Sequence, residues 1–516
     1  MDFIDSQLAT EIERRRTFAI ISHPDAGKTT LTEKLLLFGG AIREAGSVKG
    51  KSTKKYATSD WMGIEKKRGI SVTSTALQFE YENFKINILD TPGHEDFSED
   101  TYRTLIAADC AVMLIDAAKG IETQTLKLFQ VCRMRQVPII TFINKLDREG
   151  REPLDLLKQI EDVLHINTYP MNWPVSMGAD LRGVFNRSSH TFESYDGREI
   201  TDELHQQLMD DISLLDVAGE TMDSEKVWDG ELTPVFFGSA ITNFGVETFL
   251  KEFIKLAPPP RPRKTKQGFV APLDTEFSGF VFKIQANMNP SHRDRIAFVR
   301  ICSGKFERGM SVQHVRTNKS IHLSQSQQFF AQDRTTVDIA FPGDIIGIYD
   351  PGIFHIGDTL SETDTIEFEP LPQFSPEYFA RITVKDTLKY KQFHKGLQQL
   401  AEEGAVQVFH MVSRTEDIVL GVVGELQFEV FEYRMKAEYG TDITKHVLPY
   451  QFARWVAATS LPTLQYDRSS CLLVTDQYAK HALLFPDEYT MQWAINKNPK
   501  IVLHPTSFAL DASSDD

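Results

Sequence analysis

Cysteine is scarce in this sequence of 516 residues and is spread too widely to build a cross-linked scaffold. The four cysteines lie far apart, and none belongs to a C-x-x-C pair; they are Cys110, Cys132, Cys302 and Cys471. This spacing disfavours both a zinc site and a disulfide framework. We therefore expect reduced thiols.

Long apolar runs are also lacking. The run at residues 110–115 ends at Asp116, well short of the roughly 20 residues that a membrane span needs. Residues 1–16 carry several acidic side chains and no apolar segment of the kind found in secretory signals. We expect a cytoplasmic protein that makes no contact with membranes.

An excess of positive charge is missing as well, because the net charge is −16. Proteins that coat nucleic acid indiscriminately neutralise phosphates with clustered lysines and arginines, so this class is disfavoured. Local RNA contact stays open. Residues 49–55 and 261–266 are basic stretches, although a solvated loop or linker is the favoured explanation of each.

The length and the 41% apolar content predict two to four domains, each with its own core. Short apolar segments at residues 18–21, 85–89, 111–115, 138–143 and 234–237 alternate with amphipathic stretches, which indicates a parallel sheet covered by helices. We predict an α/β phosphate-loop domain (1–260), a proline-marked linker (261–270), a β-barrel domain (271–371) and an α+β third domain (372–516). The acidic tail, residues 511–516, is expected to be flexible.

A phosphate-binding loop follows the first predicted strand and opens a predicted helix at residues 30–38. Gly27 lets the backbone approach a phosphate, Lys28 reaches the β and γ phosphates, and the Thr29 hydroxyl binds Mg²⁺. Ser22 replaces the glycine with which the general pattern begins. The residues expected to bind phosphate are Ser22, His23, Pro24, Asp25, Ala26, Gly27, Lys28, Thr29 and Thr30.

A second candidate segment ends the next strand and reads Asp90, Thr91, Pro92, Gly93 and His94. A carboxylate at this point can hold Mg²⁺ through water, and the Gly93 amide can sense a γ phosphate. Alone, the segment would also fit a plain Pro-Gly turn.

Base recognition is predicted at two further strand ends, Asn144-Lys145-Leu146-Asp147 and Gly238-Ser239-Ala240. A carboxylate such as Asp147 accepts two hydrogen bonds from guanine, whereas adenine lacks the 2-amino donor and leaves the carboxylate partly unpaired. The base is therefore guanine. All four segments occur in order at the ends of successive strands, where open α/β sheets bind ligands.

These motifs resemble those of translational GTPases. Arg68-Gly69-Ile70-Ser71 is similar to their first switch segment, with Ser71 where the family usually has threonine. The resemblance implies Mg²⁺ ligation by Thr29, Ser71 and Asp90, and a water-orienting catalytic role for His94. It also implies a monovalent cation near Asp25.

The resemblance extends beyond the first domain. Residues 295–304 and 342–346 are similar to the second-domain barrel of elongation factors, and residues 396–404 and 422–426 to the third domain of elongation factor G. About 90 residues follow Leu426, too few for the two further domains of that factor. Residues 60–62, before the first switch segment, and residues 389–393, in the third domain, resemble segments of the class II peptide-chain release factors. A three-domain chain of this length most resembles that family.

This resemblance implies a ribosome-stimulated GTPase, converting GTP to GDP and phosphate, that acts in translation termination. Its expected partners are the ribosome, through ribosomal RNA and proteins, and the class I release factors, whose dissociation after peptide release it would promote. Another ribosomal GTPase, an elongation or ribosome-protection factor, is the runner-up. A nucleotide-gated binding protein without turnover is the alternative from another class, and His94 argues against it.

Replacing Asp147 tests the predicted base. The Asp147→Asn variant should bind GTP more weakly and shift its preference toward XTP, because the 2-oxo group of xanthine replaces the donor that the carboxylate reads. Competition binding with the two nucleotides measures the shift. An unchanged preference for GTP would remove Asp147 from the base pocket.

Overall fold

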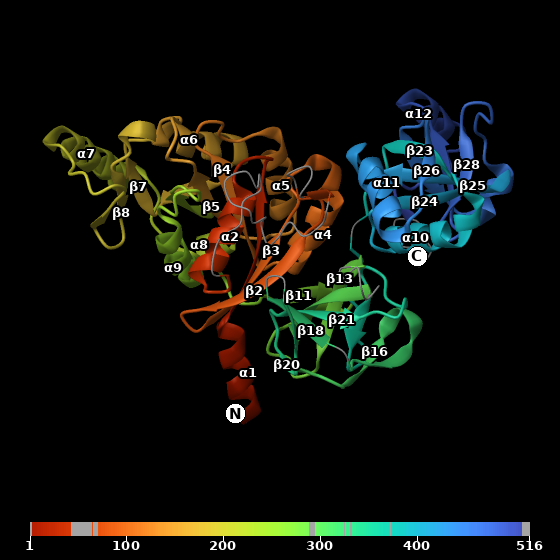
Figure 1. Ribbon diagram of the computed structural model, residues 1–516, viewed down its shortest axis with the longest axis horizontal. Coiled ribbons are helices and arrows are strands. Elements are labelled where there is room, and N and C mark those ends of the chain that lie inside the picture. Colours follow the sequence, from red (N-terminus) through yellow and green to blue (C-terminus); the bar gives the residue numbers. More distant parts are fainter. Residues whose placement is uncertain are drawn as a thin grey trace.

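The computed structural model describes residues 3–42, 64–65, 71–287, 295–324, 326–330, 333–371 and 373–507. Figure 1 shows the helix-covered first sheet, an antiparallel β domain below it and a third domain beside both. The predicted multidomain fold class is confirmed. Several sequence features discussed above lie outside the described residues: the basic stretch 49–55, residues 60–62, residues 68–70 of the first switch segment and the tail 511–516.

The first domain is built on a seven-stranded sheet in the order β2-β3-β1-β4-β5-β10-β6. Neighbouring strands run parallel except β2 and β3. The strands are β1 (Arg15–Ser22), β2 (Thr75–Tyr81), β3 (Phe84–Asp90), β4 (Cys110–Asp116), β5 (Ile139–Asn144), β6 (Asn167–Pro170) and β10 (Leu232–Phe237). β1, β4, β5 and β10 are buried throughout, which explains their nearly continuous apolar sequences.

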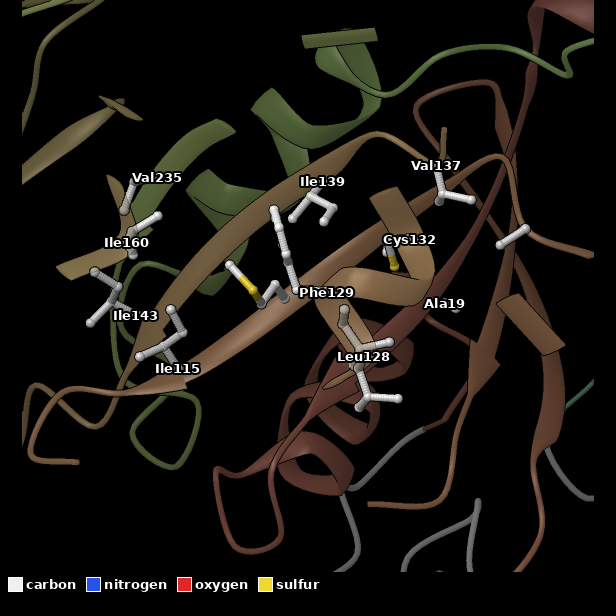
Figure 2. Close-up of a cluster of buried hydrophobic side chains, with 14 of the residues drawn as sticks. Ala19, Ile115, Leu128, Phe129, Cys132, Val137, Ile139, Ile143, Ile160 and Val235 are labelled. Atoms are coloured by element: carbon white, nitrogen blue, oxygen red, sulfur yellow. The ribbon is translucent and has the colours of Figure 1, made fainter. Parts of the chain in front are cut away.

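Helices cover both faces of this sheet, and a further helix precedes β1. They are α1 (Phe3–Glu13), α2 (Lys28–Phe38), α4 (Ser98–Ala107), α5 (Thr123–Met134), α6 (Pro153–Leu164), α8 (Ser224–Trp228) and α9 (Val246–Leu256). One apolar cluster lies under α5 and α6, and a second lies under α2 and α9. Figure 2 shows Leu128, Phe129 and Cys132 of α5 beside the strands of the first cluster. All four cysteines are free and buried, and burial raises the pKa of Cys132 to about 12.

An insertion between β6 and β10 carries a small three-stranded sheet and a long helix. Its elements are β7 (Asn172–Val175), β8 (Gly183–Asn186), β9 (Thr191–Ser194) and α7 (Asp202–Ala218). Trp173 Nε1 donates to Asp211 Oδ2 of α7 at 3.1 Å. Figure 1 shows α7 at one end of the molecule, away from the second and third domains. The apolar pattern of the sequence does not predict this insertion.

The second domain is antiparallel throughout and holds an eight-stranded sheet in the order β17-β16-β22-β13-β14-β21-β18-β19 around one core. Its strands are β13 (Ser278–Ala286), β14 (Arg295–Ser303), β16 (Ser311–His314), β17 (Lys319–His322), β18 (Ser326–Phe330), β19 (Asp333–Thr336), β21 (Ile345–Tyr349) and β22 (Thr359–Ser361), with the pair β15 (Phe306–Glu307) and β20 (Ile339–Ala340). The predicted linker, residues 261–270, contains a hairpin of β11 (Arg263–Thr265) and β12 (Gly268–Val270).

The third domain pairs a seven-stranded sheet, in the order β26-β23-β25-β24-β28-β29-β27, with three helices. The strands are β23 (Tyr378–Val384), β24 (Gln407–Met411), β25 (Arg414–Val422), β26 (Ile443–Leu448), β27 (Phe452–Val456), β28 (Leu472–Asp476) and β29 (His481–Phe485). The helices are α10 (Tyr390–Glu402), α11 (Leu426–Tyr439) and α12 (Glu488–Lys497). Among the described residues, no helix has the length and apolar character required to span a bilayer.

A buried ion network joins the first and second domains. Asp344 is fully buried, lies 2.9 Å from Arg15 Nη2 and 3.4 Å from Lys85 Nζ, and accepts the Phe341 amide at 3.0 Å. Burial alone would raise the pKa of Asp344, but the two cations hold that pKa below its ordinary value. The carboxylate is therefore charged and paired.

Removing this carboxylate should destabilise the interface. Asp344→Ala removes one of the two carboxylates that buried Arg15 contacts, and Glu11 Oε2 stays 2.6 Å from Nη1. We therefore expect a cost of at most about 3–5 kcal/mol, the range for breaking a buried pair. Asp338→Ala in the same domain is the control, because Asp338 forms an exposed pair with Arg308 and such pairs contribute at most about 1 kcal/mol. Scanning calorimetry should give a clearly lower melting temperature for Asp344→Ala only. Equal shifts would contradict this assignment.

Candidate nucleotide-binding site

A cavity of about 530 Å³ opens at the carboxyl ends of the parallel strands and brings together residues of the phosphate loop, Ser71, and residues of the segments 90–94 and 144–147. The predicted residues that line it are Ser22, His23, Pro24, Asp25, Gly27, Lys28, Thr29, Thr30, Ser71, Gly93, His94, Asn144, Lys145 and Asp147. Arg148 and Ile241 also line it, and neither was among the predicted site residues. The other predicted residues are buried in the surrounding structure: Ala26, Asp90, Thr91, Pro92, Leu146, Ser239 and Ala240.

The phosphate loop connects β1 to α2, and its conformation requires a glycine. Gly27 precedes the first residue of α2 with φ 101°, and a Cβ added there would overlap Asn144 Nδ2. Asn144 Nδ2 donates to Ala26 O at 2.8 Å, so the phosphate loop is tied to the predicted base-binding segment. The amino end of α2 therefore faces the cavity with backbone donors suited to an anion.

Lys28 and Asp90 form a buried ion pair beneath this loop. Their Nζ and Oδ1 atoms are 2.9 Å apart, and Nζ also donates to Thr91 O. The cation expected to bind phosphate and the carboxylate expected to face Mg²⁺ thus neutralise each other. Magnesium–nucleotide fits this arrangement, because it carries a partner for each charge.

The metal donors at this site are few. Within the described residues, no group of three or more histidine, cysteine, aspartate or glutamate side chains is arranged to hold a metal ion. Thr29, Ser71 and Asp90 offer two hydroxyls and one carboxylate. Such a sparse oxygen set suits Mg²⁺ that is completed by phosphate oxygens and water.

The predicted base-binding segment is held by hydrogen bonds to its neighbours. Asn144 Oδ1 accepts the Ala240 amide at 2.8 Å, and Asp147 Oδ1 accepts the Ser239 hydroxyl at 2.5 Å. Lys145, with φ 74°, places Nζ 2.7 Å from Asp116 Oδ2. Burial opposes ionisation of Asp116, but hydrogen bonds from Lys145 and Ala118 lower its pKa, so the pair is charged.

Asp116 supports the site but was not among the predicted site residues. It could have been predicted from its position at the end of β4, because the strands on either side, β1 and β5, both end at predicted site residues.

His94 lines the cavity and caps the amino end of the short 3₁₀ helix η1 (Glu95–Phe97). Its side chain is 37% exposed, so the imidazole can meet a bound ligand or solvent. The Asp96 amide donates to His94 Nδ1 at 3.3 Å, and Asp96 Oδ1 lies 3.2 Å from the same nitrogen. Asp25 is an exposed cavity residue with φ 65°.

Comparison with known proteins agrees with this arrangement. Three family models match consecutive parts of the chain: Elongation factor Tu GTP binding domain (residues 13–259), Elongation factor G domain 2 (276–363) and Class II release factor RF3, C-terminal domain (368–495). The crystal structure of ttk003000868 from Thermus thermophilus aligns with a TM-score of 0.71 over 90% of this chain and 72% of that chain, at 21% identity. This last likeness concerns the fold.

Full-length relatives are similar in sequence. Peptide chain release factor 3 of Symbiobacterium thermophilum is 56% identical, covering 97% of this chain and 99% of the relative. The proteins of the same name from Macrococcus caseolyticus and Listeria innocua are each 54% identical, covering 96% and 97% of this chain and 99% of each relative.

The GTP-binding domain and the domains that follow it define a translational GTPase, an enzyme that binds and hydrolyses GTP. More narrowly, the chain belongs to the peptide chain release factor 3 family, the GTPases of translation termination.

Lys28 provides a test of the phosphate loop. Lys28→Ala should weaken GTP binding about 10- to 100-fold, since a hydrogen bond to a charged group contributes about 1.5–3 kcal/mol. Lys34→Ala, on the same helix but away from the cavity lining, should bind normally. Equilibrium binding of labelled GTP decides, and wild-type affinity of Lys28→Ala would exclude this loop as the phosphate site.

Proposed function

We propose that this GTPase binds the ribosome after peptide release and, as it changes nucleotide state, drives class I release factors from it. The observation that carries the proposal is the similarity to peptide chain release factor 3 proteins over 96–97% of the chain. The proposed GTP site is also connected to the third domain, because Asp96, two residues after His94, accepts the Leu426 amide. Its place of action is then the cytoplasm, and its contacts include ribosomal RNA and proteins.

In the proposed complex, the phosphates lie on the amino end of α2 and Lys28 turns from Asp90 to their oxygens. Asp147 reads guanine, and Ser239 keeps its carboxylate oriented. Thr29, Ser71 and Asp90 would hold Mg²⁺, which would supply charge neutralisation for the phosphates. Asp25 is the proposed neighbour of a monovalent cation.

His94 is the proposed catalytic residue. It lies on the same cavity as Lys28 and is exposed enough to orient an attacking water, the role that glutamine has in Ras-like proteins. Hydrolysis requires that the imidazole point at the γ phosphate, so a partner that reorients the loop would stimulate turnover. The ribosome is that proposed partner.

The other readings predict different behaviour. An elongation or ribosome-protection factor would turn over GTP on ribosomes but would not accelerate loss of a class I factor. A nucleotide-gated binding protein would bind GTP without ribosome-stimulated turnover. Measuring GTP turnover and class I factor dissociation on the same ribosomes separates the three.

His94→Ala should leave GTP affinity nearly intact while ribosome-stimulated turnover falls at least about a hundredfold, the usual size of acid–base and positioning effects. His205→Ala, an exposed histidine on α7, is the matched control. If dissociation of the class I factor needs only the GTP-bound shape, one round should survive the mutation while multiple turnover fails. Wild-type turnover would exclude His94 as catalytic, and lost GTP binding would make it structural.

A further inference from the structure

The loop that carries His94 is held from the opposite side by the third domain. Asp96, two residues beyond His94, accepts the Leu426 amide on Oδ2 at 2.7 Å, at the start of α11. A Cβ added at Gly424 would overlap Asp96 Cγ, so the third-domain backbone packs directly on this carboxylate. The contact joins residues that are 330 positions apart in the chain.

An apolar contact reinforces this junction. Phe97 at the end of η1 packs with Val430 of α11, and Val72 belongs to the same buried cluster. Val72 follows Ser71, the proposed Mg²⁺ ligand, directly in sequence. The amino end of α11 therefore lies against segments adjoining both the proposed metal site and the proposed catalytic histidine.

Polar contacts with the second domain also hold the third domain, through the neighbouring residues Glu402 and Glu403. Glu403 Oε1 accepts the Ala286 amide at 2.7 Å, and Arg434 of α11 donates to Glu403 Oε2 at 2.5 Å. Arg295 pairs with Glu402. A displacement of the third domain would have to break the Ala286–Glu403 and Arg295–Glu402 contacts together with the Leu426–Asp96 hydrogen bond.

We infer that Asp96 is a positioning residue that makes the orientation of His94 depend on docking of the third domain. Its two carboxylate oxygens have separate partners: Oδ2 accepts the Leu426 amide, and Oδ1 lies 3.2 Å from His94 Nδ1. His94 Nδ1 accepts the Asp96 amide at 3.3 Å, so in the neutral imidazole Nε2 carries the proton, and the position of Asp96 sets the direction of the ring. Undocking frees the carboxylate and, with it, the ring. This inference rests on the proposed role of His94.

Three variants change the junction in different ways. Asp96→Ala removes both acceptors, whereas Asp96→Asn keeps one oxygen and loses the other. Gly424→Ala leaves Asp96 and His94 unaltered but pushes the carboxylate from the third-domain side. Asp487→Ala is the control, because Asp487 caps α12 by accepting the Thr490 amide at 2.7 Å, away from this junction.

The full-length variants are compared by GTP affinity and by kcat at saturating ribosomes. For Asp96→Ala we expect affinity within about twofold of wild type and kcat lowered at least about tenfold, as for other losses of alignment in an active site. Asp96→Asn and Gly424→Ala should show smaller falls in kcat, and Asp487→Ala none. Wild-type kcat in both Asp96→Ala and Gly424→Ala overturns the inference.

A double-mutant cycle separates positioning of His94 from a purely structural contribution. In the His94→Ala background, Asp96→Ala should cause no further loss of kcat, because its effect acts through the histidine. An equal loss in both backgrounds would show that Asp96 only supports the fold or ribosome binding, and would overturn the inference. Wild-type turnover of His94→Ala alone would instead reject the proposed function on which the cycle depends.

Discussion

The buried pair between Lys28 and Asp90 is the interaction on which the site depends. It joins the first residue of α2 to the last residue of β3, and both side chains are almost fully buried. Removing one partner from such a pair leaves an uncompensated charge in a poorly solvated place. Only a ligand that brings both an anion and a cation can separate the two at low cost. Magnesium–GTP has this property, so its binding at the proposed site would be coupled to the position of the loop after Asp90.

That loop connects the nucleotide site to the rest of the molecule. The Thr91 hydroxyl donates to Ile20 O at 2.6 Å, which holds the start of the loop on β1. Farther along, Asp96 contacts the third domain and Asp100 Oδ2 accepts the Ser74 amide at 2.6 Å. The buried Lys283 of the second domain also contacts Ser74, 3.2 Å from its hydroxyl, and its charge helps keep the pKa of Asp100 low despite burial. A change in the conformation of residues 91–100 would therefore alter contacts that involve all three domains.

Much of the first domain was predictable because its signals are local. Buried parallel strands have continuous apolar sequences, and β1, β3, β4, β5 and β10 were all anticipated from them. The direction of β2 was harder to predict from the sequence. This strand pairs antiparallel with β3, and it is only partly buried, so its sequence lacks the continuous apolar run of the other strands. The insertion with β7–β9 and α7 was missed because its strands are short and the pairing is local to that sheet.

The sequence by itself determined which segments are proposed to bind the nucleotide, because each is a short stretch whose residue types and position at a strand end predict its ligand. The tertiary structure decided which groups meet. Asp116 with Lys145, Ile241 at the cavity and Asp96 with Leu426 join positions far apart in the chain. Such pairings depend on how strands are ordered and domains are docked, and no short-range pattern of residues encodes that geometry.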